Sequence, residues 1–139
     1  MNYSLLDPES FAIFLTRFIL GVLFFFQGYD KVIKLGVKGV VNVVGPSYKK
    51  LGFPDWAIYL TSFITSWIEF AGGGLLIIGL FRHTVIYLLG IDLMIVCIGM
   101  SMIDPVWDMK LVLPRLALLV AYLLMNFNSD VFCIDKLIN

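Results

Sequence analysis

Long runs of apolar residues, interrupted by very few charges, dominate the chain. The four longest runs cover residues 10–29, 56–81, 83–103 and 111–129. Each approaches or exceeds the roughly 20 mostly apolar residues that a helix needs to cross a membrane. A helix that is apolar on every side lies in lipid or in a large protein core, and 139 residues cannot supply such a core for four helices. The pattern therefore predicts an all-α integral membrane protein, a four-helix bundle forming one domain over residues 1–139.

The composition supports a membrane location and excludes several classes of function. Hydrophobic residues make up 60% of the chain and charged residues 14%, with a mean hydropathy of +0.96, whereas about 25% of an ordinary soluble domain is charged. Ten basic and ten acidic residues leave no net charge, so no positive field would attract nucleic acid. The single His and the two Cys, which are not spaced as C-x-x-C, match neither the pattern of a zinc site nor that of a thiol redox pair. We expect the lipid bilayer as a partner, no nucleic acid and no metal.

The connection between the first two membrane helices, at residues 30–55, holds five lysines. Its apolar residues Ile33, Val37, Val40, Val41 and Val44 share one face of a helix, opposite Lys31, Lys34 and Lys38. This pattern predicts an amphipathic helix that lies at the membrane interface and ends at Gly45 and Pro46. The alternative is a loop that packs its valines on the bundle.

The distribution of basic residues predicts the orientation in the membrane. Positively charged loops stay on the cytoplasmic side, and the lysine-rich connection shares its side with the loop at residues 104–110, which adds Lys110. The other side offers only Arg82 and Lys136. We therefore expect a multi-pass protein of the inner (cytoplasmic) membrane with both termini on the non-cytoplasmic side. Residues 1–10 contain no Lys or Arg, so the first helix is not expected to be a cleaved signal peptide.

Each apolar stretch contains one formal charge, and these are Arg17, Glu69, Asp92 and Arg115 in chain order. An ionised group at the middle of a bilayer costs about 2.5–3.5 kcal/mol, so it persists only where a partner or a function compensates. Two cations and two anions allow two ion pairs inside the bundle. The position of each residue along its helix favours Arg17 with Glu69 and leaves Asp92 with Arg115 as the second candidate pair.

Polar and small residues on three of the helices recur at intervals of three and four, which places them on one face of each helix. These faces hold Arg17, Gly21, Phe24, Gly28 and Lys31 in the first helix, Ser62, Ser66, Glu69, Gly73 and Leu76 in the second, and Arg115, Leu119, Tyr122 and Asn126 in the fourth. Two explanations remain open. The charges and glycines could only fix how the helices pack, or Arg17, Lys31 and Glu69 could line a polar cavity that holds a lipid headgroup, a quinone ring or a proton.

Two segments carry a resemblance to a known family. Residues 17–31 read RFILGVLFFFQGYDK, and residues 69–82 read EFAGGGLLIIGLFR. With these segments, the chain resembles the DoxX family of small four-helix membrane proteins over residues 17–103. The resemblance implies a compact bundle with signature positions at Arg17, Gly21, Gly28, Lys31, Glu69, Gly73, Gly79 and Arg82. Asp92 and Arg115 lie outside this signature, so a second polar pair would be particular to this chain.

The resemblance also implies a range of functions. Some DoxX-like proteins are subunits of membrane complexes that pass electrons from sulfur compounds to quinone, others accompany redox-defence enzymes, and distant relatives look like assembly factors. We therefore expect an inner-membrane subunit of a larger assembly, with protein partners and quinone as a candidate cofactor. Such a chain is not an enzyme on its own, but it could be the membrane subunit of an oxidoreductase. The alternatives are a small proton-coupled transporter that uses Glu69 and Asp92, and an assembly factor for membrane proteins without a small ligand.

Overall fold

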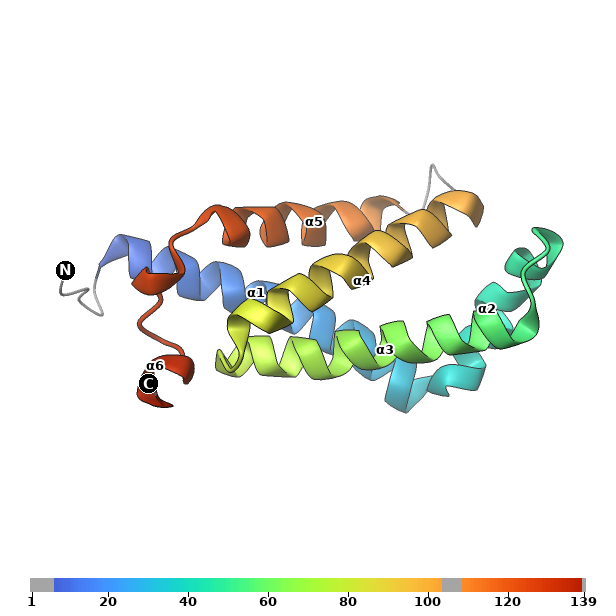
Figure 1. Cartoon of the computed structure of the whole chain (residues 1–139), viewed down its shortest axis with the longest axis horizontal. Helices are drawn as coiled ribbons and strands as arrows, with labels where there is room; N and C mark the ends of the chain where they lie inside the picture. The colour runs from blue at the N-terminus through green and yellow to red at the C-terminus, as the bar shows by residue number, and fades with distance from the viewer. Residues whose placement is uncertain (1–6, 104–108, 139) are drawn as a thin grey trace.

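The computed structural model describes residues 7–103 and 109–138, and these residues form helices and turns without any strand. In chain order the elements are α1 (Pro8–Tyr29), the π-helix η1 (Asp30–Lys34), α2 (Gly36–Lys50), α3 (Asp55–Ile78), α4 (Arg82–Ile103), α5 (Met109–Leu124), the 3-10 turn η2 (Phe127–Ser129) and α6 (Asp135–Ile138). The long helices extend along the long axis of the molecule, with the start of α1 and with α6 at one end and α2 at the other (Figure 1). The all-α prediction is confirmed for the described residues.

Three helices are long and apolar enough to cross a membrane, namely α1 continued by η1, α3 and α4. The helix predicted over residues 111–129 extends too far, because α5 has 16 residues and ends at Leu124. Such a helix is about 24 Å long, whereas the hydrocarbon core is roughly 30 Å thick. The helix stops because the side chain of Asn126 accepts a hydrogen bond from the Asn128 backbone N–H at 3.2 Å, which begins η2. The structure therefore supports a multi-pass membrane protein with three candidate spans among the described residues.

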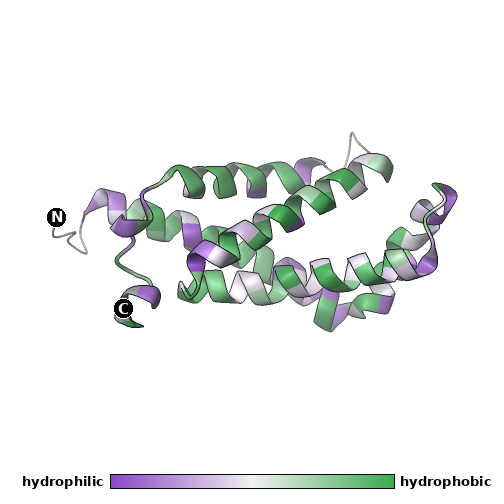
Figure 2. Ribbon diagram, viewed as in Figure 1, coloured by the Kyte–Doolittle hydropathy of each residue, from purple (hydrophilic) through white to green (hydrophobic). Residues whose placement is uncertain are grey.

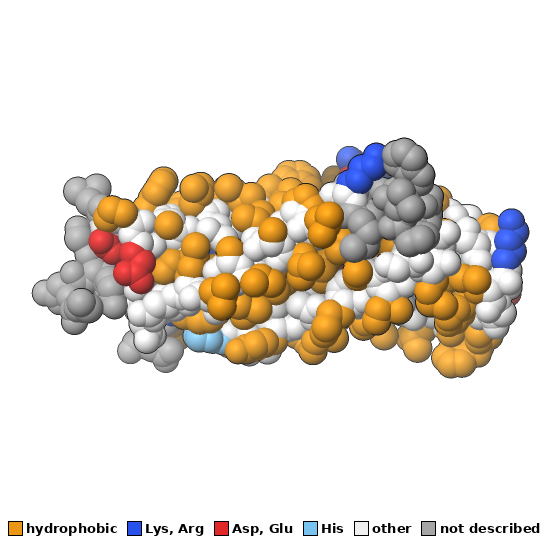
Figure 3. Space-filling view, turned by 90° about the horizontal axis from the view of Figure 1, so that it is seen from above, with side chains coloured by type: hydrophobic (Ala, Val, Ile, Leu, Met, Phe, Trp, Pro, Cys, Tyr) orange, Lys and Arg blue, Asp and Glu red, His pale blue; other side chains and the backbone are white. Residues whose placement is uncertain are grey.

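The helices enclose a narrow core and present an apolar exterior. Both α1 and α4 pack against α3 and α5, and the core between them includes Leu20, Phe24, Leu76 and Leu89. Hydrophobic residues recur along the long helices (Figure 2), and many of their large side chains are exposed, among them Phe26, Trp56 and Ile98. On the face seen in Figure 3, hydrophobic side chains extend between acidic side chains at one end and basic side chains near the other. An apolar exterior of this extent fits lipid rather than water.

Helices α1 and α3 lie in backbone contact at glycines. A Cβ atom added to Gly28 would lie 2.2 Å from the backbone nitrogen of Phe70, and one added to Gly73 would lie 2.3 Å from that of Phe25. Gly21 is also too close to α3 for a side chain. Small residues allow this kind of approach between membrane helices. The close contact predicted for the glycine run in the second apolar stretch is confirmed at Gly73.

These contacts fix the register of the two antiparallel helices. Because Gly28 lies against Phe70, Glu69 is level with Tyr29. Arg17 lies twelve residues before Tyr29 on the same helix. At a rise of about 1.5 Å per residue, Arg17 is therefore about 18 Å away from the level of Glu69 along the helix axis.

The lysine-rich connection folds as η1 and α2, which confirms a helix between the first two spans. Helix α2 packs against α3, and its residues Val40 and Val44 face a cavity inside the molecule. The predicted end at Gly45 and Pro46 is wrong, because α2 continues beyond them and the chain turns away where Gly52 has a φ of 87°. A proline inside a helix removes one N–H donor and crowds the carbonyl four residues before it, but α2 continues through Pro46 to Lys50. The helix thus turns Val40 and Val44 inward and leaves Val43 exposed, while its place at a membrane interface stays a prediction.

The first helix begins and the last one ends at the same end of the molecule (Figure 1). Residues 104–108, which belong to the loop used in predicting the orientation, lie outside the described residues. The side of the membrane on which the two termini lie therefore stays a prediction.

The contact between α1 and α3 predicts different effects for alanine at two neighbouring glycines. Gly73→Ala would place a methyl group inside the backbone of α1, and overpacking of this kind costs about 1–3 kcal/mol. Gly74→Ala is the matched control, because its methyl group would lie 3.6 Å from the Phe25 ring in ordinary contact. Thermal unfolding in mild detergent, followed by circular dichroism, should show a lower midpoint for Gly73→Ala only. Equal midpoints for the two variants would contradict the register.

Candidate functional site

Two groups of charged side chains are buried or partly buried at different levels of the molecule. The Arg17 group consists of Arg17, Arg82, Asp130 and Asp135. The Glu69 group consists of Lys31, Glu69, Asp92 and Arg115. The two groups differ in their position relative to a cavity, because Lys31 and Arg115 line it and no member of the Arg17 group does.

Arg17 is fully buried and joins three parts of the chain. Its Nε donates a hydrogen bond to Asp130 Oδ2 at 2.8 Å. Its Nη1 donates to the carbonyls of Leu76 and Ile77 at 2.6 and 2.8 Å, and its Nη2 donates to the carbonyl of Phe132 at 2.7 Å. The last carbonyls of a helix have no partner within it, and a cation is favourable there. Arg17 therefore caps the C-terminus of α3 and attaches the segment after α5 to it.

The start of α4 is held by the same C-terminal segment. Asp135 accepts hydrogen bonds from the backbone N–H groups of Phe81 at 2.8 Å and Arg82 at 3.1 Å. Phe81 has a φ of 51°, a left-handed conformation that a non-glycine residue rarely adopts. The Arg82 side chain lies 3.5 Å from Asp130 and donates to the Phe127 carbonyl at 2.8 Å. The Arg17 group is thus a structural connection between α1, α3, α4 and the C-terminal segment.

The predicted pairing of Arg17 with Glu69 is wrong. The register of α1 and α3 separates the two residues, and Arg17 pairs with Asp130 instead. Arg17 is also not among the residues that line the cavity. Asp130 was missed because it follows the fourth apolar stretch in a polar segment, where nothing in the sequence marks it as buried.

Glu69 is fully buried and contacts two cations. Lys31 Nζ lies 2.6 Å from its Oε2, and Arg115 Nη1 lies 3.7 Å from its Oε1. Arg115 also donates a hydrogen bond to the side-chain oxygen of Gln27. Lys31 was expected both on the polar face of the connection with Lys34 and on the inner face of the first helix with Gly28, and the structure turns it inward, to Glu69.

Asp92 lies in the middle of α4 and has no exposed surface. Neither of its carboxylate oxygens has a hydrogen-bond partner among the residues that the structure describes. The predicted pair of Asp92 with Arg115 is not found among the described residues, and Arg115 Nη1 contacts Gln27 and Glu69 instead. Asp92 is therefore a buried polar group that is left unsatisfied, which is uncommon in proteins and calls for a physical explanation.

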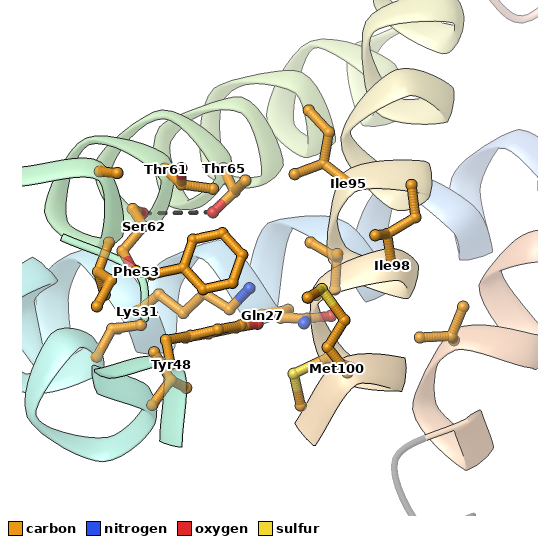
Figure 4. Close-up of a pocket in the computed structure, with 18 of the residues that line it drawn as sticks. Gln27, Lys31, Tyr48, Phe53, Thr61, Ser62, Thr65, Ile95, Ile98 and Met100 are labelled. Atoms are coloured by element: carbon orange, nitrogen blue, oxygen red, sulfur yellow. Dashed lines mark hydrogen bonds between the residues drawn. The ribbon is translucent and has the colours of Figure 1, made fainter. Parts of the chain in front are cut away.

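A cavity of about 400 Å³ lies beside the Glu69 group (Figure 4). Most of its walls are apolar and come from residues such as Val40, Val44, Ile58, Ile95, Ile98 and Val112. Its polar lining residues are Gln27, Lys31, Tyr48, Thr61, Ser62, Thr65 and Arg115. Helices α2 and α3 face α4 across it. The side chain of Gln27 points into it from the end of α1, and that of Lys31 from η1 (Figure 4).

The charges around the cavity are arranged in two layers. The cations Lys31 and Arg115 line it, whereas Glu69 and Asp92 are fully buried and are not among its lining residues. The cavity therefore presents N–H donors to an occupant, and the carboxyl groups lie behind these donors. Largely apolar walls with a few convergent polar groups are typical of small-molecule binding sites. The site is suited to a molecule with an apolar body and oxygen acceptors at one end.

Sequence reasoning found Lys31, Glu69, Asp92 and Arg115 but missed Gln27 and Tyr48. Gln27 precedes Lys31 by four residues, so its place on the same helix face could have been recognised. Tyr48 falls after the predicted end of the amphipathic helix. Its hydroxyl fits against α4 because Gly99 has no side chain, since a Cβ atom there would lie 2.5 Å from that oxygen.

Comparison with known proteins identifies a family. The sequence model of the DoxX family matches residues 12–101. This range includes Arg17, Lys31, Glu69 and Asp92, and it ends before α5 and the C-terminal segment. No curated protein and no solved structure gives a significant match to the chain.

The Arg17 group predicts that Asp130→Asn is strongly destabilising. Removing one member of a buried ion pair leaves an uncompensated charge and typically costs about 3–5 kcal/mol. The control is Asp30→Asn, because Asp30 forms an exposed pair with Lys34 at 2.6 Å, and exposed pairs contribute about 0–1 kcal/mol. Unfolding in detergent and limited proteolysis after residue 124 should both reveal the loss in Asp130→Asn. If both variants unfold like the wild type, the group is not a structural connection.

Proposed function

The chain belongs to the DoxX family, and we propose that it is a membrane subunit that holds one amphiphilic molecule, with quinone as the leading candidate. The cavity beside Lys31 and Arg115 is the proposed binding site. In this role the subunit binds and positions the molecule, and the electron-transfer centre is supplied by a protein partner in a larger assembly.

The observation that carries this proposal is the uneven polarity of the cavity. Gln27, Lys31 and Arg115 lie together on its lining, while the walls formed by α2 and α4 are mainly apolar. A quinone ring has carbonyl oxygens that accept hydrogen bonds, and its hydrocarbon chain favours apolar surroundings. N–H donors from charged groups make stronger hydrogen bonds than neutral donors do. The lining therefore matches both ends of such a molecule.

The surroundings of the cavity support entry from the bilayer. The cavity lies between helices whose outer faces are apolar, among them the candidate spans α3 and α4. A lipid-soluble molecule would reach it without crossing a polar surface. We place the protein in the inner membrane with both termini on the non-cytoplasmic side, because the exposed lysines Lys38, Lys49 and Lys50 gather on α2, at the end of the molecule away from α6.

Two other functions make different predictions for the protein purified from its native membrane. A subunit with a bound amphiphile should carry extractable quinone or a defined lipid and should copurify with a protein partner in fixed ratio. An assembly factor would have protein partners and no stoichiometric small molecule. A proton-coupled transporter would be isolated without a stoichiometric protein partner. Mass spectrometry of the proteins and of the organic extract separates these three cases.

Filling the cavity should remove the bound molecule without changing the fold. Val44→Phe places a ring in the cavity, whereas Val43→Phe, its neighbour, is the matched control because Val43 is 69% exposed and points outward. We expect the amount of bound quinone or lipid per protein to fall about tenfold in Val44→Phe, which corresponds to about 1.4 kcal/mol of binding free energy. Unchanged thermal unfolding would show that both variants fold. Equal ligand content in the two variants would rule out this cavity as the binding site.

A further inference from the structure

Asp92 is a buried acidic side chain that the proposed binding function does not use. It lies in the middle of the candidate span α4, with no exposed surface and with both oxygens unpartnered among the described residues. The carboxyl group of Glu69, by contrast, has Lys31 at 2.6 Å and Arg115 at 3.7 Å. The two buried carboxyl groups of the Glu69 group are therefore in different electrostatic situations.

The charged groups that act on Asp92 come from three neighbouring elements. These are Glu69 on α3, Lys31 on η1 and Arg115 on α5. Lys31 and Arg115 make their direct contacts with Glu69 and not with Asp92. The nearby carboxylate of Glu69 repels a second negative charge. Helix α4 itself carries no other charged residue between Arg82 and Ile103 apart from Asp92.

We propose that Asp92 is a proton-binding site within the membrane and carries a proton in the resting protein. A carboxylate that is buried without hydrogen-bond donors loses its hydration and gains nothing in return, whereas the neutral acid avoids this cost. Lys31, Arg115 and Glu69 then form a group with one net positive charge, and the two cations face the cavity. The site binds a proton whatever molecule occupies the cavity, so it does not depend on the proposed quinone.

The proton site lies next to the cavity and is electrostatically linked to it. Ile95 and Val96, which follow Asp92 by three and four residues on α4, line the cavity, as does Arg115. A negatively charged occupant of the cavity partly neutralises the positive charge of Lys31 and Arg115. Protonation of Asp92 then becomes more favourable. A positively charged occupant has the opposite effect. The structure thus provides a proton-linked binding site, in which the charge of the occupant and the protonation of Asp92 depend on each other.

Infrared spectroscopy of the whole protein in lipid tests the proton directly. A protonated carboxylic acid has a C=O stretching band that is separate from the bands of carboxylate and amide groups. At neutral pH we expect this band in the wild type, a shift of the band when aspartate is labelled with ¹³C at its carboxyl carbon, and no shift when glutamate is labelled in the same way. We expect the band to be lost in Asp92→Asn.

Several results would overturn the proposal. One is the absence of an acid band in the wild type, and another is a band that persists in Asp92→Asn or that shifts only with labelled glutamate. Asp92→Asn exchanges a neutral acid for a neutral amide of the same shape, so the variant should fold as the wild type does. Failure of this variant to fold would therefore also contradict a neutral Asp92. None of these results bears on whether the cavity holds a quinone, which ligand analysis of Val44→Phe tests separately.

Discussion

The contact between the backbones of α1 and α3 determines where every other group in the structure lies. Gly28 and Gly73 leave no space for a side chain at this contact, so the two helices can pack in one register. That register puts Arg17 beside the last carbonyls of α3 and Lys31 beside Glu69. In a membrane, where helix association depends on close packing more than on burial of apolar surface, a few glycines are sufficient to set this arrangement. Each charged side chain then pairs with the groups that this register places next to it.

The two groups of buried charges differ in what they can still bind. In the Arg17 group, the guanidinium bonds to a carboxylate and to three backbone carbonyls, and these contacts hold the C-terminal segment in place. In the Glu69 group, the cations line a cavity, one carboxylate is paired and the other is not. Both groups keep buried atoms without a hydrogen-bond partner among the described residues, namely Arg82 Nε and Asp130 Oδ1 in the first and Glu69 Oε1 and both Asp92 oxygens in the second. The cavity therefore distinguishes them, and only the Glu69 group lies where a small molecule has room to bind.

The sequence was sufficient to predict the helical faces but not the levels at which they meet. Spacing of three and four placed Arg17, Gly28 and Glu69 on buried faces, and the structure buries all three. Spacing within one helix contains no information about the register against another helix, so the partners of Arg17 and Glu69 were assigned wrongly. The π-helix η1 was not predicted from the sequence either. The extent of α5 was overestimated because apolar composition continues up to Phe127, while the asparagines that start η2 have the stronger local effect.

Several of the positions on which the resemblance to the family rests have a structural explanation here. Gly28 and Gly73 allow the contact between α1 and α3, and Arg17 and Arg82 hold the C-terminal segment. Such residues preserve the fold and say little about the molecule that a particular member binds, because one fold can carry different functions. The walls of the cavity are formed by other residues, on α2, α4 and α5, together with Lys31. Differences in function between proteins of this fold are therefore expected in those walls and in the groups behind them, where Asp92 and Arg115 lie.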